Sequence, residues 1–211
     1  MGRPIVYGPA GSSYVWSARL ALAEKGVAHD LVEVPFGAHR EAEHLARHPF
    51  GRVPAFEHDG FALYETQAIM RYVDEAFPAE PLQPIDLHQF SRMNQIIGIV
   101  DAYAWRAIGA GIVFNRLIAP SLGLKTDEAA IAKAIPQAEL CLKEFARIAG
   151  DDEFLAGDRV SLADLMVIPL VHYLGKTSEG AGPLAQHPKL QAWARRMQER
   201  QSFQVTKPPG A

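Results

Sequence analysis

The alternation of hydrophobic and polar positions predicts a strand, a helix and a second strand at the start of the chain. Residues 3–7 are short and β-prone, and residues 27–34 return to a strand pattern. Between them, residues 14–25 carry apolar side chains at helical spacing and stop before Gly26, a residue type that commonly ends helices. Two strands of one sheet that are joined by a crossover helix are parallel. We therefore expect a parallel strand pair here.

The next segment predicts a helix, a hairpin and another helix. Residues 39–47 are helical in pattern, and residues 53–57 and 61–64 are short strands whose connection contains Asp59-Gly60, a pair that favours a tight hairpin. Residues 65–77 are helical again. The first part of the chain is thus expected to be an α/β domain of order βαβαββα, with a mixed four-stranded sheet covered by helices.

Prolines then interrupt the pattern, and everything after them is helical. Three prolines fall within residues 78–84, a spacing that suits an extended linker. Ser161-Leu162-Ala163-Asp164 has the form of a capping box at the start of an apolar helix. Helices are expected over residues 86–117, 127–149, 161–174 and 188–200. The expected organisation is a first domain over residues 1–78, a linker over 79–85 and an all-helical domain over 86–211.

Composition and charge exclude several classes of protein. With 48% hydrophobic residues, 21% charged residues and a net charge of −3, the chain lacks the basic surface that binding to nucleic acid requires. It has no signal-peptide pattern and no run of about 18 apolar residues, so we expect a soluble, cytoplasmic protein that does not bind membranes. Cys141 is the single cysteine, which permits no intrachain disulfide, and we expect it to be a buried, inert thiol.

The first candidate for chemistry is the turn before the first helix, which contains Ser12 and Ser13. The amino terminus of a helix stabilises anions, and a hydroxyl there can donate a hydrogen bond to a phosphate, a carboxylate or a thiolate. The turn lacks the GxxxxGK[ST] pattern of a nucleotide phosphate loop. Serine is also a favoured helix cap, and from spacing alone capping is the simpler interpretation.

Two further candidates present backbone and side-chain groups at the ends of strands. A cis peptide bond between Val53 and Pro54 would turn the backbone of Val53 outward toward a ligand. Glu65 and Thr66 open the third helix, where a carboxylate and a hydroxyl are either ordinary first-turn groups or ligands for the ammonium and carboxylate of an amino acid.

A fourth candidate is the basic pair His39 and Arg40, which Arg52 can join. Such a pair is either a solvated polar face or a clamp on a carboxylate.

Taken together, these segments resemble glutathione transferases, most closely the phi class and its bacterial relatives. The similarity extends over about residues 3–200, and its motifs occur in the family's order. The matching stretches are residues 12–26 (SxxV…LxLxEKG), 37–55 (GEHK…EHLARNPFGQVPA), 65–69 (ESxAI) and 156–164 (the folding motif of the carboxyl-terminal domain).

The resemblance implies a thioredoxin-like first domain that binds glutathione, with no other cofactor and no metal. Ser12 would donate its hydroxyl to the sulfur, with Ser13 as a competing candidate. Val53, before a cis Pro54, would pair its backbone with the cysteinyl part of glutathione. The γ-glutamyl end would be held by Glu65 and Thr66, and the glycine carboxylate by His39 and Arg40.

The resemblance also implies a homodimer and a pocket for a hydrophobic electrophile. Phe50 is a candidate anchor of the dimer interface. Phe36, Tyr103, Trp105 and Phe114 are weaker candidates for the electrophile pocket, because core or dimer contacts are the simpler interpretation for most of them.

Some features depart from the family or leave alternatives open. Arg52 replaces a usual Gln, and Thr66 replaces Ser but keeps the hydroxyl. We interpret Tyr7 as structural, because serine-type members often carry Tyr-Gly there. Ser12-Ser13 also resembles the SSC motif of a zeta-like isomerase, whose cysteine is Tyr14 here. The expected activity is conjugation of glutathione, with glutathione-dependent peroxide reduction as a further activity and a non-catalytic carrier or interaction protein as the alternative.

Overall fold

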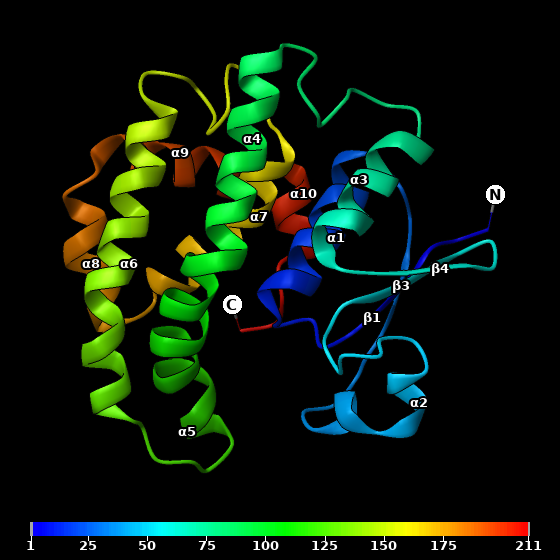
Figure 1. Ribbon diagram of the computed structural model, residues 1–211, viewed down its shortest axis with the longest axis horizontal. Coiled ribbons are helices and arrows are strands. Elements are labelled where there is room, and N and C mark those ends of the chain that lie inside the picture. The colour runs from blue at the N-terminus through cyan, green and yellow to red at the C-terminus, as the bar shows by residue number, and fades with distance from the viewer. Residues whose placement is uncertain (1, 211) are drawn as a thin grey trace. The chain divides into compact units, whose positions relative to one another are not determined.

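The structure, a computed structural model, describes residues 2–210 (Figure 1). It divides the chain into two compact units. The first unit holds the residues up to Gln83 together with those from Glu199 onward, and the second holds Pro84 to Gln198.

A four-stranded mixed sheet forms the centre of the first unit. Its strands are β1 (Ile5–Tyr7), β2 (Asp30–Val32), β3 (Ala55–His58) and β4 (Phe61–Tyr64), in the order β2-β1-β3-β4. β1 is parallel to β2, β3 is antiparallel to β1, and β4 is antiparallel to β3. The expected thioredoxin-like α/β sheet with a parallel pair and a hairpin is confirmed.

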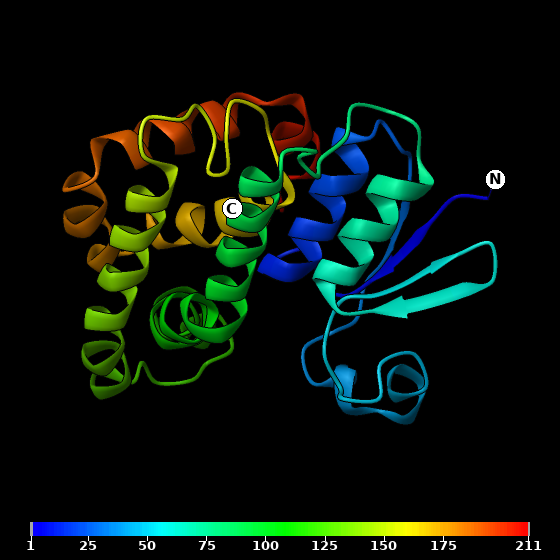
Figure 2. The same cartoon turned by 45° about the horizontal axis from the view of Figure 1, so that its top comes forward.

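Two helices cover this sheet and bury its apolar side chains. α1 (Ser13–Glu24) and α3 (Thr66–Ala76) pack against each other, as Figure 2 shows. Val15 and Trp16 on α1 and Ile69 and Met70 on α3 are fully buried.

β2 is shorter than the strand expected over residues 27–34. The N–H of Val27 donates to the carbonyl of Leu22 at 2.8 Å, closing the end of α1, so Val27 belongs to the helix terminus and not to the sheet.

The helix expected over residues 39–47 is wrong as a single element. The structure has a 3-10 helix, η1 (Ala38–Arg40), and a short α-helix, α2 (Ala42–Leu45), separated at Glu41, whose backbone is extended. The backbone hydrogen bonds change at this residue. The N–H of Glu41 closes η1 by bonding to the carbonyl of Ala38, while its own carbonyl accepts the first bond of α2 from Leu45.

The chain returns to the first unit after the helical unit. The domain expected over residues 86–211 therefore differs from the structure at its end. α10 (Gln201–Thr206), red in Figure 1, packs against α1. Trp16 Nε1 donates to Thr206 Oγ1 at 3.0 Å, and its ring lies 4.9 Å from that of Phe203. A buried indole needs a partner for its N–H, and α10 provides it.

A buried ion pair holds the extended segment that follows α3. Lys25 Nζ lies 3.0 Å from Asp74 Oδ1, and the side chains are only 2% and 3% exposed. Lys25 also donates to the carbonyls of Ala79 and Glu80, and Asp74 accepts from the backbone N–H of Leu82. The segment is therefore fixed to both helices by side chains whose charges are paired.

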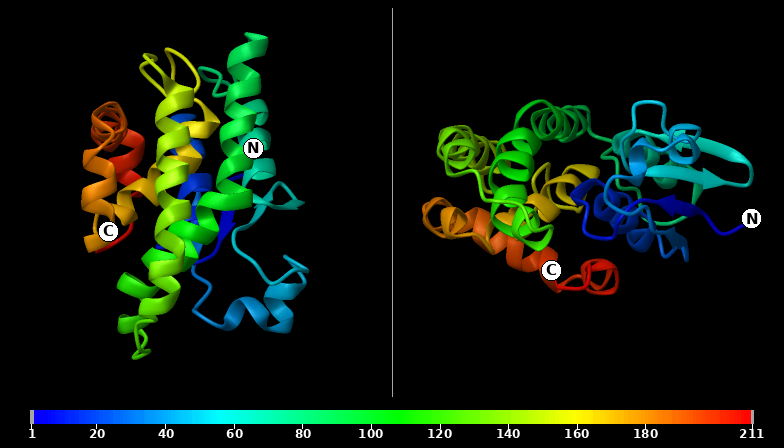
Figure 3. Two further views of the ribbon diagram at one scale, coloured as in Figure 1. Left: turned by 60° about the vertical axis from the view of Figure 1, so that its left-hand side comes forward. Right: turned by 90° about the horizontal axis from the view of Figure 1, so that it is seen from below.

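The second unit is all-helical. α4 (Leu87–Ile99), the π-helix η2 (Val100–Ile118) and α5 (Ala119–Ser121) follow one another without a break. They are followed by α6 (Glu128–Ala149), α7 (Leu162–Leu174), α8 (Ser178–Ala185) and α9 (Pro188–Glu199). α7 is buried along almost its whole length and packs against α4, η2 and α8 (Figure 3). The helices were expected except for α8, and the capping box of Ser161 and Asp164 at the start of α7 is confirmed.

The long helix Leu87–Ser121 has an apolar composition. Within the described residues it alone is long and apolar enough to cross a membrane. Buried core helices of soluble proteins meet the same criterion, and η2 buries Ala104, Ile108 and Ile112 within its unit.

The contact between α1 and α10 makes stability depend on pH. Arg200 donates two bonds to the Glu24 carboxylate, at 2.7 and 2.8 Å, and Ser202 donates a third at 2.5 Å. Burial alone would raise the pKa of Glu24, but these bonds outweigh it and hold the pKa below its ordinary value. We expect Glu24→Gln to lower the free energy of unfolding by about 1–2 kcal/mol at neutral pH.

The pKa of Glu24 is lower in the folded state than in the unfolded state. Its contribution to the free energy of unfolding is therefore fully present above the unfolded pKa of about 4.3 and is lost as pH falls through the lower folded value. Urea unfolding of the wild type and of Glu24→Gln at several pH values measures this contribution. The difference in the free energy of unfolding between the two proteins should disappear at acidic pH. Glu144→Gln, which removes an exposed pair with Arg147, is the control and should leave the midpoint unchanged. A difference that does not change with pH would contradict the role of the ion pair.

Candidate functional site

The turn after β1 brings the start of α1 next to Val53. Gly8 has a φ of 150°, and a Cβ there would lie 2.5 Å from Val15 Cγ2 and 3.1 Å from Val53 Cβ. Only glycine allows this close approach. The amino terminus of α1 and the residue before Pro54 therefore lie on the two sides of Gly8.

Ser12 is the N-cap of α1. Its Oγ accepts a hydrogen bond from the backbone N–H of Val15 at 3.4 Å, and its own N–H donates to the carbonyl of Pro9 at 3.0 Å. A hydroxyl that accepts through oxygen still has its proton to donate. Capping and donation to an anion are therefore compatible at Ser12. Ser13 is the first residue of the helix, and its carbonyl accepts a bond from Ser17 Oγ.

The segment before β3 is held against η1. The Val53–Pro54 peptide bond is cis. Gly51 has a φ of 58°, and a Cβ there would lie 3.2 Å from the carbonyl oxygen of His39. His44 Nε2 donates to the carbonyl of Arg52 at 2.7 Å. His44 was not among the predicted site residues, although it lies inside the EHLARHPFGRVPA stretch, because nothing local indicates that its ring is buried against this segment.

Cationic side chains gather where η1 meets this segment. Burial lowers the pKa of His39 below its ordinary value, and the neighbouring Arg40, His44 and Arg52 lower it further. Arg40 and Arg52 are therefore close enough for their charges to act on His39, and a carboxylate would be stabilised beside them. We call His39, Arg40 and Arg52 the basic corner.

Glu65 adopts an uncommon backbone conformation at the start of α3. Its φ is 70°, and its carbonyl accepts the N–H groups of both Ala68 and Ile69. Thr66, the first residue of the helix, is only 6% exposed. A non-glycine residue with positive φ costs about 1–3 kcal/mol, and such residues cluster at ligand sites.

Tyr7 is engaged in contacts with the protein. Its hydroxyl donates to Glu57 Oε2 at 3.2 Å, and the Arg47 guanidinium lies 4.6 Å from the centre of its ring. Burial and the negative charge of Glu57 raise the pKa of Tyr7. These contacts support the structural interpretation of Tyr7.

The aromatic residues proposed for the electrophile pocket are divided between the units. Phe36 lies exposed before η1 in the first unit, with its ring 6.3 Å from that of His39. Tyr103, Trp105 and Phe114 are on η2 in the second unit. Their joint role stays a prediction.

Three further expectations concern Phe50, Cys141 and metal binding. Phe50 is 72% exposed and packs edge-on against Tyr64, with the ring centres 6.2 Å apart. Cys141 is buried, and burial raises the pKa of its thiol, which agrees with an inert residue. Among residues 2–210, no group of three or more His, Cys, Asp or Glu side chains is arranged to hold a metal ion.

Comparison with known proteins gives the same assignment for both units. The N-terminal domain of glutathione S-transferases matches residues 6–81, and the C-terminal domain matches residues 98–201. The chain is 35% identical to glutathione S-transferase 4 of Zea mays over 190 residues, which are 89% of this chain and 84% of the relative.

Solved structures of glutathione transferases are similar to this chain over nearly its whole length. A glutathione transferase of the F type from Populus trichocarpa is 28% identical with a TM-score of 0.86, over 96% of this chain and 97% of that one. Glutathione S-transferase I from maize, in complex with an atrazine glutathione conjugate, is 29% identical with a TM-score of 0.84, over 97% and 96% of the two chains. The chain belongs to the glutathione S-transferase family, with relatives in the plant phi class, and is a glutathione transferase.

Proposed function

We propose that this transferase is of the serine type and that Ser12 activates the glutathione thiol. The observation that carries the proposal is the position of the Ser12 hydroxyl, which accepts from Val15 and keeps its proton for donation at the amino terminus of α1. A thiolate in front of Ser12 would receive this hydrogen bond and the positive end of the helix dipole.

The interactions available at Ser12 are strong enough to lower the pKa of the glutathione thiol below neutral pH. A free thiol with a pKa of about 8.5 is only a few per cent ionised at neutral pH, and the thiolate is the nucleophile. Lowering the pKa by two units requires about 2.7 kcal/mol of preferential stabilisation of the anion. One charge-assisted hydrogen bond contributes about 1.5–3 kcal/mol, and the helix dipole contributes about 0.3–1 kcal/mol.

The remaining groups of the first unit match the other parts of glutathione. The backbone of Val53, before the cis Pro54, would pair with the cysteinyl residue. Glu65 and Thr66 would take the ammonium and carboxylate of the γ-glutamyl end, and the basic corner would take the glycine carboxylate. The four groups come from separate segments of one compact unit, which supports their joint assignment.

The second substrate would be a hydrophobic electrophile that the thiolate attacks. The maize relative bound to an atrazine glutathione conjugate supports this class. The same thiolate would reduce a peroxide by attacking its terminal oxygen: the O–O bond breaks, the alkoxide takes up a proton and leaves as the alcohol, and a second glutathione converts the resulting sulfenic acid to glutathione disulfide and water. Conjugation is favoured because a relative holds a conjugate. We further propose a soluble, cytoplasmic homodimer, with the exposed Phe50 as an interface anchor.

To test this proposal, the protein is titrated with glutathione at a series of pH values. The absorbance of the thiolate reports how much of the bound glutathione is ionised at each pH. We expect the bound thiol to ionise about two pH units below the free pKa of 8.5. Binding without this shift would instead support a non-catalytic carrier. Absence of binding would contradict the glutathione site itself.

A further inference from the structure

The peptide bond between Arg52 and Val53 carries the single backbone N–H that Val53 and Pro54 can offer to a ligand, because proline has none. Val53 is half-buried, and within the described residues its N–H donates no hydrogen bond to the protein. A donor of this kind binds a ligand well when the protein fixes its direction beforehand, because less conformational freedom is then lost on binding.

His44 fixes this peptide bond from its other side. Its Nε2 donates to the carbonyl oxygen of Arg52 at 2.7 Å, which is short for a bond of this type. In the part of the chain that the structure describes, the Val53–Pro54 bond alone is cis, so the Arg52–Val53 bond is trans and its C=O and N–H point in opposite directions. A ring that holds the carbonyl therefore also aims the N–H of Val53 away from itself.

The ring of His44 makes no second hydrogen bond within residues 2–210. Its Nδ1 is buried without a partner, and the residue is only 3% exposed. Because a carbonyl oxygen can only accept, the ring proton that makes the bond to Arg52 is on Nε2. Burial of an unpaired polar atom costs free energy, and the bond to the Arg52 carbonyl offsets this cost.

The backbone between His44 and Val53 is itself closed by hydrogen bonds. The carbonyl of His44 accepts from the N–H of His48 at 2.9 Å, and the carbonyl of His48 accepts from the N–H of Gly51 at 2.8 Å. The ring of His48 lies 6.3 Å from that of His44 and 4.8 Å from that of Tyr64 on β4. The segment from α2 to Val53 is thus a closed loop held against the sheet.

We propose that His44 is a positioning residue of this transferase, which aims the N–H of Val53 at the carbonyl of the cysteinyl residue by holding the Arg52 carbonyl. The inference rests on the proposed function, which assigns the Val53 backbone to glutathione. The cysteinyl backbone does not change charge during the reaction, so this contact stabilises the bound substrate and the transition state equally. Loss of such a contact raises KM and leaves kcat unchanged.

The test is a pair of variants of similar size, His44→Gln and His44→Met. Gln carries an amide N–H near the position of Nε2, whereas Met has no donor. We expect His44→Met to weaken binding of glutathione in calorimetry and to raise its KM by about 5- to 10-fold, with kcat within about twofold of the wild type. His44→Gln should recover most of the affinity. S-methylglutathione, which has no ionisable thiol, should lose affinity by the same factor, and this separates the effect from activation by Ser12.

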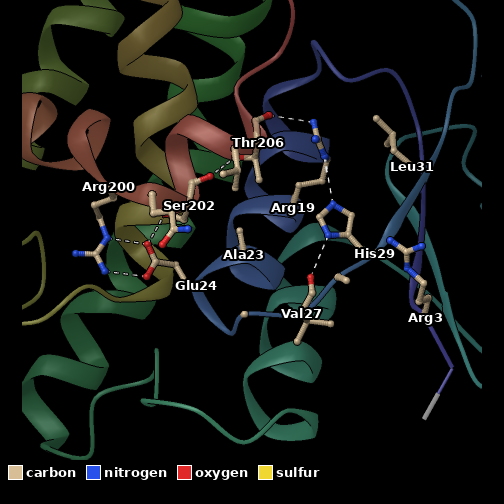
Figure 4. Close-up of a pocket in the computed structure, with 14 residues that line it drawn as sticks. Arg3, Arg19, Ala23, Glu24, Val27, His29, Leu31, Arg200, Ser202 and Thr206 are labelled. Atoms are coloured by element: carbon tan, nitrogen blue, oxygen red, sulfur yellow. Dashed lines mark hydrogen bonds and ion pairs between the residues drawn. The ribbon is translucent and has the colours of Figure 1, made fainter.

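His29 provides a matched control on the same unit. Its Nδ1 donates to the carbonyl of Val27 at 3.3 Å, so its ring also bonds to a backbone carbonyl (Figure 4). It lines a pocket of about 830 Å³ to which none of the residues assigned to glutathione contributes. His29→Met and His29→Gln should therefore bind glutathione like the wild type.

A measurement on the wild type does not depend on how well the variants fold. The nitrogen chemical shifts of the His44 ring in NMR spectra report which nitrogen carries the proton, and we expect Nε2, with a coupling across the hydrogen bond to the carbonyl carbon of Arg52. A proton on Nδ1 would overturn this inference alone, and so would equal affinities of His44→Met and His44→Gln for glutathione while the wild type binds it. No binding by the wild type would overturn the proposed function and this inference together.

Discussion

Replacing Ser12 by alanine is expected to lower kcat/KM for conjugation about 5- to 25-fold at neutral pH. The variant removes the hydroxyl that would donate to the sulfur, and the loss of a charge-assisted hydrogen bond of about 1.5–3 kcal/mol raises the pKa of the bound thiol by about one to two units, so that a much smaller fraction of it is ionised. Turnover with a generic aromatic electrophile measures it. Because the defect is one of ionisation, it should shrink as pH rises toward the free thiol pKa of about 8.5, where glutathione ionises without help.

The controls separate activation of the thiol from capping of the helix. Ser12 also accepts from Val15, so alanine costs about 1 kcal/mol of stability as a lost cap, which unfolding measures independently. Ser12→Thr keeps both the cap and the donor and should retain most of the activity. Ser13→Ala should behave like the wild type. A wild-type rate in Ser12→Ala, or a major loss in Ser13→Ala, would contradict the assignment of the activator to Ser12.

Much of the fold could be predicted because local chemistry determines it. The hairpin follows from Asp59-Gly60 between two short strands, and the start of α7 follows from the spacing of Ser161 and Asp164. The parallel pair of β1 and β2 follows from a strand, a helix and a strand in succession. In each case the elements that decide the structure follow one another directly along the chain.

Features that depend on distant contacts could not be predicted. α10 lies on α1 because Trp16 and Glu24 find partners in Thr206 and Arg200, about 180 residues later in the chain. η1 and α2 form separate helices where periodicity indicates one, and the carbonyl of His39 lies against Gly51, which comes after the end of α2. No local pattern contains this information.

The residues of the candidate site also divide into those that local sequence indicates and those that depend on distant contacts. Ser12, Glu65 and Thr66 stand at helix starts that the sequence marks, so they could be named in advance. His44, whose buried ring donates a hydrogen bond to the carbonyl of Arg52, could not be named in advance. Arg52, which departs from the usual Gln of the family, lies where its charge acts on His39. Its position therefore supports a role in the basic corner.

Asp164 is the residue whose loss should destabilise the helical unit most. Its carboxylate is fully buried and accepts four hydrogen bonds. Oδ1 accepts from the N–H of Leu155 at 2.9 Å and from Trp193 Nε1 at 2.8 Å, while Oδ2 accepts from the N–H and the hydroxyl of Ser161, each at 2.8 Å. One side chain thus joins the start of α7 to the preceding loop and to α9.

We expect Asp164→Ala to lower the free energy of unfolding by about 3–5 kcal/mol, because it leaves several buried donors without an acceptor and removes the capping box. For a chain of this size, that corresponds to a fall in Tm of about 6–20 °C. Thermal unfolding by circular dichroism measures the change. Asp127→Ala is the matched control, because Asp127 caps α6 from an exposed position with one bond to Ala130 and should cost only about 1 kcal/mol. If the two variants unfold at the same temperature, the buried network around Asp164 adds nothing to stability beyond an ordinary helix cap.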